Sequence, residues 1–236
     1  MTEPLFLTDA YRREAPARVV RASSDGIVLD ASLFYAASGG QPGDCGQLDW
    51  AGGSLEVSDA AKREGGAILL VPGDGALPPE GVEVLQRIDW RRRHAHMRCH
   101  TALHLLSVVL PFPVTGGAVG EGKGRLDFDM AEPPGDLAAI EAALNDLVAR
   151  DLPVSAEWVE EAVLDANPVL VKTLSVKPPR GTGRVRLVRI GEGEGTVDLQ
   201  PCGGTHVART GEIGPLRLGK LEKKGRQNRR VGILLA

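Results

Sequence analysis

The order of apolar and polar positions divides the chain into a strand-rich first part and a mixed second part. Up to about residue 88, short apolar or alternating runs are separated by turn sequences rich in Gly, Pro, Ser and Asp. These runs cover residues 17–20, 26–29, 67–71 and 82–88. Short strands joined by tight turns are typical of a small barrel. We therefore expect an N-terminal β-barrel domain over residues 1–88.

A helical pattern follows the predicted barrel. Asp89 can cap a helix because its side chain accepts hydrogen bonds from the first backbone N–H groups, and Pro111 and Pro113 cannot continue that helix. The pattern therefore predicts a helix from residue 89 to residue 110. Apolar residues recur at helical spacing again over residues 135–150, where we expect a second helix.

Beyond residue 154 the pattern returns to strands, interrupted by a short helical piece near residues 160–166. The strands are expected at residues 169–176, 184–190 and 196–199. Separate runs of strands and helices favour an α+β fold over a parallel α/β one. We therefore predict two domains, with residues 89–236 forming an α+β domain behind the barrel.

Composition restricts the compartment. None of the apolar runs approaches the roughly 18 to 20 residues that span a bilayer, and acidic Glu3 and Asp9 stand where a signal peptide would carry basic residues. Cys45, Cys99 and Cys202 make an odd number of cysteines without the spacing of a secreted disulfide scaffold. We expect free thiols in a cytoplasmic protein that does not interact with membranes.

Charge is unevenly distributed. The net charge of −3 argues against indiscriminate coating of nucleic acid, but residues 1–90 hold 7 basic and 14 acidic residues, whereas residues 91–236 hold 21 and 17. Residues 220–230 contain six basic residues and one Glu. This stretch suits contacts with phosphates, and the alternative is a solvated terminal strand and loop.

Two short strings contain residues with metal-ligand chemistry. His100 and His104 stand four apart in the predicted helix and therefore share one face. Cys202 and His206 repeat this spacing in a Gly-rich segment that favours a tight loop. A thiolate with imidazoles is a ligand set that zinc prefers. We expect these four residues to bind zinc.

Several segments together carry a family resemblance. They are Phe34-Tyr-Ala-Ala-Ser-Gly-Gly-Gln-Pro-Gly-Asp44, Asp89-Trp-Arg-Arg92, His100-Thr-Ala-Leu-His104, Gln200-Pro-Cys-Gly-Gly-Thr-His206 and the basic stretch 220–230. In combination they resemble the free-standing alanyl-tRNA editing proteins, called AlaX, and the editing domain of alanyl-tRNA synthetase. The resemblance extends over roughly residues 25–236.

The resemblance implies both fold and function. AlaX proteins of the medium type have an N-terminal β-barrel followed by the α/β editing domain that threonyl- and alanyl-tRNA synthetases share. The expected activity is hydrolysis, in trans, of tRNA for alanine that carries serine or glycine. The expected cofactor is zinc and the expected partner is tRNA. ATP is not expected, since we find no segment that indicates an aminoacylation core.

The resemblance also suggests where tRNA binds. The family's Gly-rich loop is linked to acceptance of alanine tRNA, which points to Gly39, Gly40 and Gln41, although a hairpin turn explains these glycines equally well. In the basic stretch, the candidates for phosphate contact are Lys223, Lys224, Arg226, Arg229 and Arg230.

The chemistry of the site leaves alternatives open. A zinc peptidase would carry a Glu directly after the first His, where this chain has Thr101. An aminoacyl ester needs less help from a carboxylate, so Thr101, Gln200 and Thr205 are candidates for aligning water or substrate. One of the four zinc ligands could stay outside the first shell, with His206 as the candidate. The other class of function is a noncatalytic tRNA-binding module in which four ligands enclose the zinc.

Leu103 departs from the related synthetase editing domains, which often have Thr immediately before the second His. The preference between serine and glycine is therefore open.

Overall fold

The structure, a computed structural model, describes residues 1–174 and 183–236. The chain forms two compact units, Met1–Ala95 and His96–Ala236. We call them unit 1 and unit 2 and describe each by itself. The helix α1 (Trp90–Val109) begins just after the predicted domain boundary at residue 88, and the two compact units divide within this helix.

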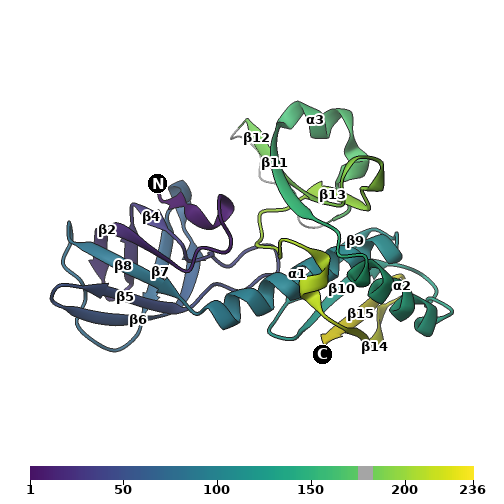
Figure 1. Ribbon diagram of the computed structural model, residues 1–236, viewed down its shortest axis with the longest axis horizontal. Coiled ribbons are helices and arrows are strands. Elements are labelled where there is room, and N and C mark those ends of the chain that lie inside the picture. The colour runs from purple at the N-terminus through teal and green to yellow at the C-terminus, as the bar shows by residue number, and fades with distance from the viewer. Residues whose placement is uncertain (175–182) are drawn as a thin grey trace. The chain divides into compact units, whose positions relative to one another are not determined.

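Unit 1 is a closed six-stranded barrel, as the sequence predicts (Figure 1). Its strands follow the order β2-β3-β7-β6-β5-β8. They are β2 (Glu14–Ser23), β3 (Gly26–Leu29), β5 (Gly46–Trp50), β6 (Gly53–Lys62), β7 (Ile68–Pro72) and β8 (Glu83–Ile88). Two short strands, β1 (Glu3–Pro4) and β4 (Ala31–Ser32), pair in parallel. Burial alternates along β2 and β8, so one face of each strand fills the barrel.

The Gly-rich segment of unit 1 forms a tight turn. Ser38 and Gln41 exchange backbone hydrogen bonds of 3.1 and 2.9 Å around Gly39 and Gly40, whose φ angles are +58° and +83°. Two successive positive φ angles favour glycine at both positions. Further along, a Cβ at Gly43 would lie 2.1 Å from the Asp59 carboxylate. The segment therefore needs glycine for backbone geometry and for close packing.

Asp44, at the end of this segment, is tied to the first turn of α1. Its Oδ2 accepts hydrogen bonds from the Tyr35 amide at 2.7 Å and from Arg93 Nε at 2.9 Å. Arg93 and Asp44 form a salt bridge in which both side chains are buried. Arg93 also donates to the carbonyl of Ala10 at 3.0 Å. This ion pair joins the Gly-rich segment to the helix within unit 1.

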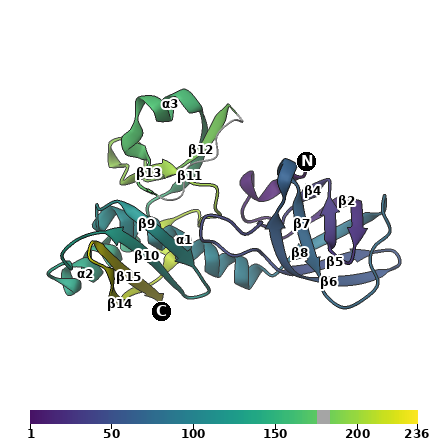
Figure 2. The ribbon, with the colours of Figure 1, turned by 180° about the vertical axis from the view of Figure 1, so that it is seen from behind.

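Unit 2 contains a four-stranded antiparallel sheet in the order β14-β15-β10-β9. The strands are β9 (Val114–Val119), β10 (Lys123–Asp129), β14 (Leu216–Gly225) and β15 (Asn228–Leu235). The helix α2 (Leu137–Ala149) packs along β14, where Asn145 exchanges hydrogen bonds of 2.9 Å with the backbone of Leu216. Both views show α1 and α2 beside this sheet (Figures 1 and 2).

A second, three-stranded sheet of unit 2 leads to the Cys202 loop. It has the order β11-β12-β13, with β11 (Val154–Glu160), β12 (Arg184–Ile190) and β13 (Asp198–Pro201). The short helix α3 (Glu161–Ala166) follows β11. Figure 2 shows this sheet in green, with α3 above it.

The α+β fold class is confirmed, and the predicted helices form with small shifts at their ends. As expected, Asp89 accepts a hydrogen bond from the Arg92 amide at 3.0 Å. The strand predicted over residues 169–176 is wrong as far as it can be followed. Pro168–Leu170 form a 3-10 turn and Thr173 makes only an isolated bridge, while residues 175 and 176 lie outside the described residues. The reason is that Val169 is 82% exposed, so its apolar side chain does not mark a buried strand face.

Within residues 1–174 and 183–236, none of the helices combines the length and apolarity that a membrane span needs.

Candidate metal centre

The helix α1 supplies two neighbouring imidazoles to the candidate metal site. His100 and His104 are both buried, and their ring centroids lie 5.3 Å apart. A neighbouring side of α1, about 100° around the helix from the two histidines, packs on β10, where a Cβ at Gly124 would lie 2.5 Å from Cys99 Sγ and 3.2 Å from Leu103. Glycine at this position therefore allows the helix to approach the sheet closely. Leu103, the departure from the synthetase pattern, packs on this side of the helix.

The loop after β13 supplies Cys202 and His206. Cys202 donates its backbone N–H to the carbonyl of Arg186 on the neighbouring strand at 3.1 Å. Arg186 Nη1 in return donates to the carbonyls of Cys202 and Gly204, at 2.9 and 3.0 Å. The guanidinium thus fixes the shape of the loop. The Gly204 amide also lies 3.4 Å from Cys202 Sγ, where it can donate to a thiolate.

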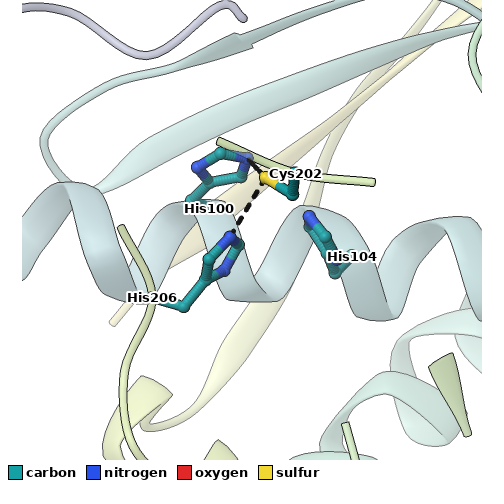
Figure 3. A group of neighbouring side chains, drawn as sticks. All are labelled: His100, His104, Cys202 and His206. Atoms are coloured by element: carbon teal, nitrogen blue, oxygen red, sulfur yellow. Dashed lines mark hydrogen bonds between the residues drawn. The ribbon is translucent and has the colours of Figure 1, made fainter. Parts of the chain in front are cut away.

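The four predicted ligands converge, as Figure 3 shows. One ligand atom from each of His100, His104, Cys202 and His206 lies within 4.8 Å of the others. The Sγ of Cys202 is 3.5 Å from Nε2 of His100 and 3.2 Å from Nε2 of His206. Zn–S and Zn–N bonds of about 2.3 and 2.05 Å in a tetrahedron separate ligand atoms by roughly 3.3 to 3.6 Å. Both the spacing and the soft donor set therefore fit a zinc-type ion, and His206 lies with the other ligands.

Hydrogen bonds on the far side of two imidazoles orient them. His104 Nδ1 lies 2.8 Å from Asp198 Oδ2 and so donates its proton to that carboxylate. His206 Nδ1 lies 3.2 Å from Thr101 Oγ1, and this hydroxyl donates to the carbonyl of Met97 at 2.9 Å. Thr101 therefore accepts from His206. In both rings the Nε2 lone pair is left for the cluster.

The electrostatics of the cluster favour metal-binding protonation states at Cys202 and His206, but not at His104. Burial opposes ionisation of the Cys202 thiol, but the His100 and His206 imidazoles outweigh it and hold the pKa of Cys202 well below its usual value. Burial, reinforced by His100, lowers the pKa of His206 to about 3, so this ring is neutral at pH 7. Burial also disfavours the charged form of His104, but hydrogen bonding to Asp198 raises its pKa to about 9. A metal would therefore have to displace a proton from His104.

The structure gives two of the predicted catalytic residues another task. Thr101 Oγ1 is engaged with Met97 and His206. Gln200 Nε2 donates to Asp198 Oδ2 at 2.8 Å and lies behind His104. Both side chains contact a predicted metal ligand, Thr101 the ring of His206 and Gln200 the ring of His104. Thr205 is fully buried.

Sequence reasoning missed Asp198 and Lys172. The Asp198 side chain is fully buried, and its Oδ1 accepts a hydrogen bond from Lys172 Nζ at 2.5 Å. A signal for Asp198 was present, because residues two apart on a strand share a face and Asp198 stands two before Gln200 and four before Cys202. Lys172 lies 30 residues before Cys202 in an irregular segment, where spacing along the sequence does not indicate which residues share a face.

The predicted tRNA contacts of unit 1 are partly accessible. Gly39 and Gly40 are exposed at the turn, so their backbone is open to a ligand. Gln41 is 2% exposed, which argues against a direct contact from its side chain. Arg93, within the basic start of α1, is buried in its ion pair with Asp44.

The basic stretch 220–230 forms the hairpin of β14 and β15, and its residues differ in availability. Arg229 is buried and donates to the carbonyls of Gly225, Asn228 and Ala131. Arg230 forms a two-pronged pair with Asp127 at 2.7 and 2.9 Å. That both arginines contact phosphates stays a prediction, and phosphates would have to compete with these bonds, which hold the hairpin to neighbouring chain segments. The exposed residues Lys223, Lys224 and Arg226 remain, and we call them the basic tip.

Comparison with known families matches both parts of the chain. Residues 185–231 match the model for the second additional domain of threonyl and alanyl tRNA synthetases. This stretch includes Cys202 and His206. Residues 6–92 match the model for class II (A) tRNA synthetases, and this stretch covers the barrel of unit 1.

Curated relatives extend the similarity over nearly the whole chain. The alanyl-tRNA editing proteins AlaX-M of Methanosarcina acetivorans and Methanosarcina barkeri are 36% and 35% identical, and each alignment covers 98% of both chains. An alanine–tRNA ligase of Pyrobaculum arsenaticum is 38% identical over 233 residues. The chain spans about a quarter of the length of that ligase, against 98% of the length of the two editing proteins.

Proposed function

Because the chain belongs to the family of alanyl-tRNA editing proteins of the AlaX-M type, we propose that it is a trans-editing hydrolase. It would deacylate tRNA for alanine that carries serine or glycine after release from the synthetase. The bond broken is the ester between the amino acid and the terminal ribose, so the enzyme is a carboxylic ester hydrolase. Its substrate class is used in translation, and we propose the cytoplasm as its compartment.

The single observation that carries this proposal is the four-ligand cluster in a chain that matches editing proteins from end to end. We propose zinc as the metal, held by His100, His104, Cys202 and His206. When bound, it would supply a Lewis acid that positions and polarises the aminoacyl group or the attacking water. The alternative is a noncatalytic tRNA-binding module in which the same four ligands hold a structural zinc. We favour the enzyme because the relatives of this chain are named editing proteins, and editing requires hydrolysis.

The surrounding residues suit ester hydrolysis better than peptide hydrolysis. The nearest carboxylate we find behind the ligands is Asp198, which is 3% exposed and is occupied by His104 and Lys172. It therefore cannot act as the general base that zinc peptidases use. An ester leaving group is a ribose alkoxide that needs less protonation than an amine, so a site without a free carboxylate among residues 1–174 and 183–236 is less costly for ester hydrolysis.

For tRNA binding we propose two surfaces, one in each unit. The exposed turn at Gly39 and Gly40 offers backbone groups that a nucleotide can approach closely. The basic tip offers exposed cationic side chains to phosphates. Lys224 pairs with Glu222 at 2.7 Å, and phosphate would have to compete with this exposed carboxylate.

The test is deacylation of tRNA for alanine charged with serine, glycine or alanine by purified, zinc-loaded protein. We expect turnover of at least one mischarged tRNA and sparing of the alanyl-tRNA. The Cys202→Ala variant should lose this turnover because it removes the thiolate ligand. Cys45→Ala is the matched control, since Cys45 is a half-buried thiol in unit 1 and should keep full activity.

Each outcome decides between the two functions. Absence of turnover on every mischarged tRNA by the zinc-loaded protein, with tRNA still bound, would establish the noncatalytic module in place of the enzyme. Equal hydrolysis of alanyl-tRNA would leave a hydrolase but remove the editing function, because editing requires discrimination against the correct product.

A further inference from the structure

Asp198 is a buried carboxylate that accepts hydrogen bonds from three side chains. Its Oδ2 accepts from His104 Nδ1 and from Gln200 Nε2, both at 2.8 Å. Its Oδ1 accepts from Lys172 Nζ at 2.5 Å. A buried carboxylate is costly unless it is paired and hydrogen-bonded, so these contacts are needed to keep Asp198 ionised where it lies.

Lys172 is held in place both by its backbone and by its side chain. Its carbonyl accepts from the Val114 amide at 2.9 Å, and the Leu174 amide donates to the Val114 carbonyl at 2.8 Å. Segment 172–174 therefore lies beside the first residue of β9. At the other end, Nζ also lies 3.5 Å from Ser107 Oγ on α1. A lysine fixed at both ends loses less rotamer entropy when it pairs with Asp198 than a free surface lysine would.

The strand periodicity explains why the carboxylate lies behind a ligand. Along β13, Asp198 and Gln200 are buried, whereas Leu199 and Pro201 are half-exposed. Cys202 continues this face at the next alternate position. The strand β13 therefore supplies the acceptor that orients His104 on the facing helix, and the first residue after the strand supplies the thiolate.

The two oriented imidazoles have acceptors of different strength. His104 donates to a carboxylate, whereas His206 donates to the neutral hydroxyl of Thr101. A charged acceptor makes the shorter and stronger hydrogen bond, here 2.8 Å for His104 against 3.2 Å for His206. Such a bond also increases the basicity of the opposite ring nitrogen, Nε2, and so its strength as a metal ligand. His104 is therefore the imidazole whose position depends most on its support.

We propose that Lys172 and Asp198 are positioning residues that together hold His104 for the metal and set how tightly the site retains it. This inference rests on the metal site of the proposed function and deepens it. Lys172 fixes the charge and orientation of Asp198, and Asp198 fixes the tautomer and direction of the His104 ring. Neither residue touches the substrate.

The experiment measures zinc affinity of the full chain by competition with a chromophoric chelator, together with the visible spectrum of the cobalt-substituted protein. We expect Asp198→Asn to weaken zinc binding by about 10- to 100-fold, as losses of such supporting groups typically do. Thr101→Val, which removes the neutral acceptor of His206, should weaken it less. Lys172→Met should weaken binding by roughly tenfold, and Lys172→Arg should restore most of the loss.

A matched control and a spectrum separate positioning from general destabilisation. Lys224→Met removes an exposed lysine that also pairs with a carboxylate, and it should leave zinc affinity unchanged. The cobalt d–d bands should shift in Asp198→Asn and Lys172→Met while the thiolate charge-transfer band remains, because Cys202 is still bound. If Asp198→Asn does not fold, the two variants Lys172→Met and Lys172→Arg decide the question. The Lys172 side chain is partly exposed, so we expect both of these variants to fold.

The inference is overturned if Lys172→Met and Lys172→Arg both bind zinc as the unchanged protein does, with the same cobalt spectrum. Its failure differs from failure of the proposed function. A protein that binds zinc, responds to these substitutions as expected and hydrolyses none of the charged tRNAs would keep the positioning role and lose the editing activity. A protein that binds no zinc would lose both.

Discussion

The buried ion pair of unit 1 predicts a large loss of stability when one partner is removed. Arg93 and Asp44 are 0% and 1% exposed, and the carboxylate is the anion that faces the Arg93 guanidinium. Replacing Asp44 by Ala leaves a positive charge inside the barrel unit, and its remaining acceptors among the described residues are the carbonyls of Ala10 and Leu33. Loss of one partner of such a pair costs about 3 to 5 kcal/mol of the free energy of unfolding.

Glu14→Ala is the matched control for this prediction. Glu14 also pairs with an arginine, Arg87, at 3.3 Å, but the two side chains are 63% and 50% exposed. Solvent screens this pair, and its loss should cost no more than about 1 kcal/mol. The comparison therefore isolates burial as the cause of the difference between the two variants.

Urea unfolding followed by tryptophan fluorescence measures both variants. Trp50 and Trp90 lie in unit 1 and Trp158 lies in unit 2. A Trp158→Phe background therefore makes the signal specific to unit 1. With a slope of about 2 kcal/mol per molar urea, Asp44→Ala should lower the midpoint by roughly 1.5 to 2.5 M. The control should shift it by less than about 0.5 M.

Two results would refute this reasoning. If Asp44→Ala costs no more than Glu14→Ala, the Arg93 charge must find another partner or water, and burial does not decide its energy. If Asp44→Ala leaves stability intact but abolishes deacylation, the role of Asp44 in the Gly-rich segment is contact with tRNA and not the attachment of that segment to α1.

Three further predictions follow from the geometry of unit 2. Cys202→Ala should lower zinc content measured by elemental analysis, whereas Cys45→Ala should not; equal zinc in both would place the metal elsewhere. Neutralising the basic tip should weaken tRNA binding and flatten its salt dependence by about one unit per lost phosphate contact, while Arg229→Ala should instead lower thermal stability. Hydrogen bonding to Arg230 outweighs partial burial and holds the pKa of Asp127 below its usual value. The contribution of ionised Asp127 to the free energy of unfolding is therefore fully present above about pH 4 and is lost as the pH falls further. The difference in unfolding free energy between the unchanged protein and Asp127→Asn should accordingly shrink below that pH.

The fold was predictable where local pattern and burial agree. Strands β3 and β12 and both long helices lie where periodicity predicts them. Strands β5 and β6 were not predicted, because Leu48, Leu55 and Val57 are the large aliphatic residues of segment 46–62 and stand among glycine, serine and acidic residues. In the closed barrel Leu48, Leu55, Val57 and Ala60 of these two strands lie in the core, and pairing with neighbouring strands adds further stability. Closure of a sheet is a long-range property that a local pattern does not report.

The basic stretch illustrates a different limit. Sequence composition counts Arg229 and Arg230 as equal to Lys223 and Arg226, since all are cationic and close together. In the hairpin the alternation of β15 turns Arg229 inward, and the register of β10 with β15 sets Asp127 directly opposite Arg230. The partner of each charge is thus determined by register, which composition cannot supply.

The candidate metal site shows which of the residues that support predicted ligands can themselves be predicted from a motif. Ligands are recognised from residue type and spacing, and their supports can be sought by the same periodicity: an acceptor two or four residues before a ligand at a strand end shares its face. Asp198 meets this rule for Cys202, yet it supports His104, because the strand faces the helix and the ring of one element reaches the carboxylate of the other. Lys172 meets no such rule, since its place depends on the backbone bonds between Val114 and segment 172–174. Substitution of Asp198 therefore tests a supporting residue that the local sequence pattern could have indicated. Substitution of Lys172 tests one that only the tertiary fold reveals.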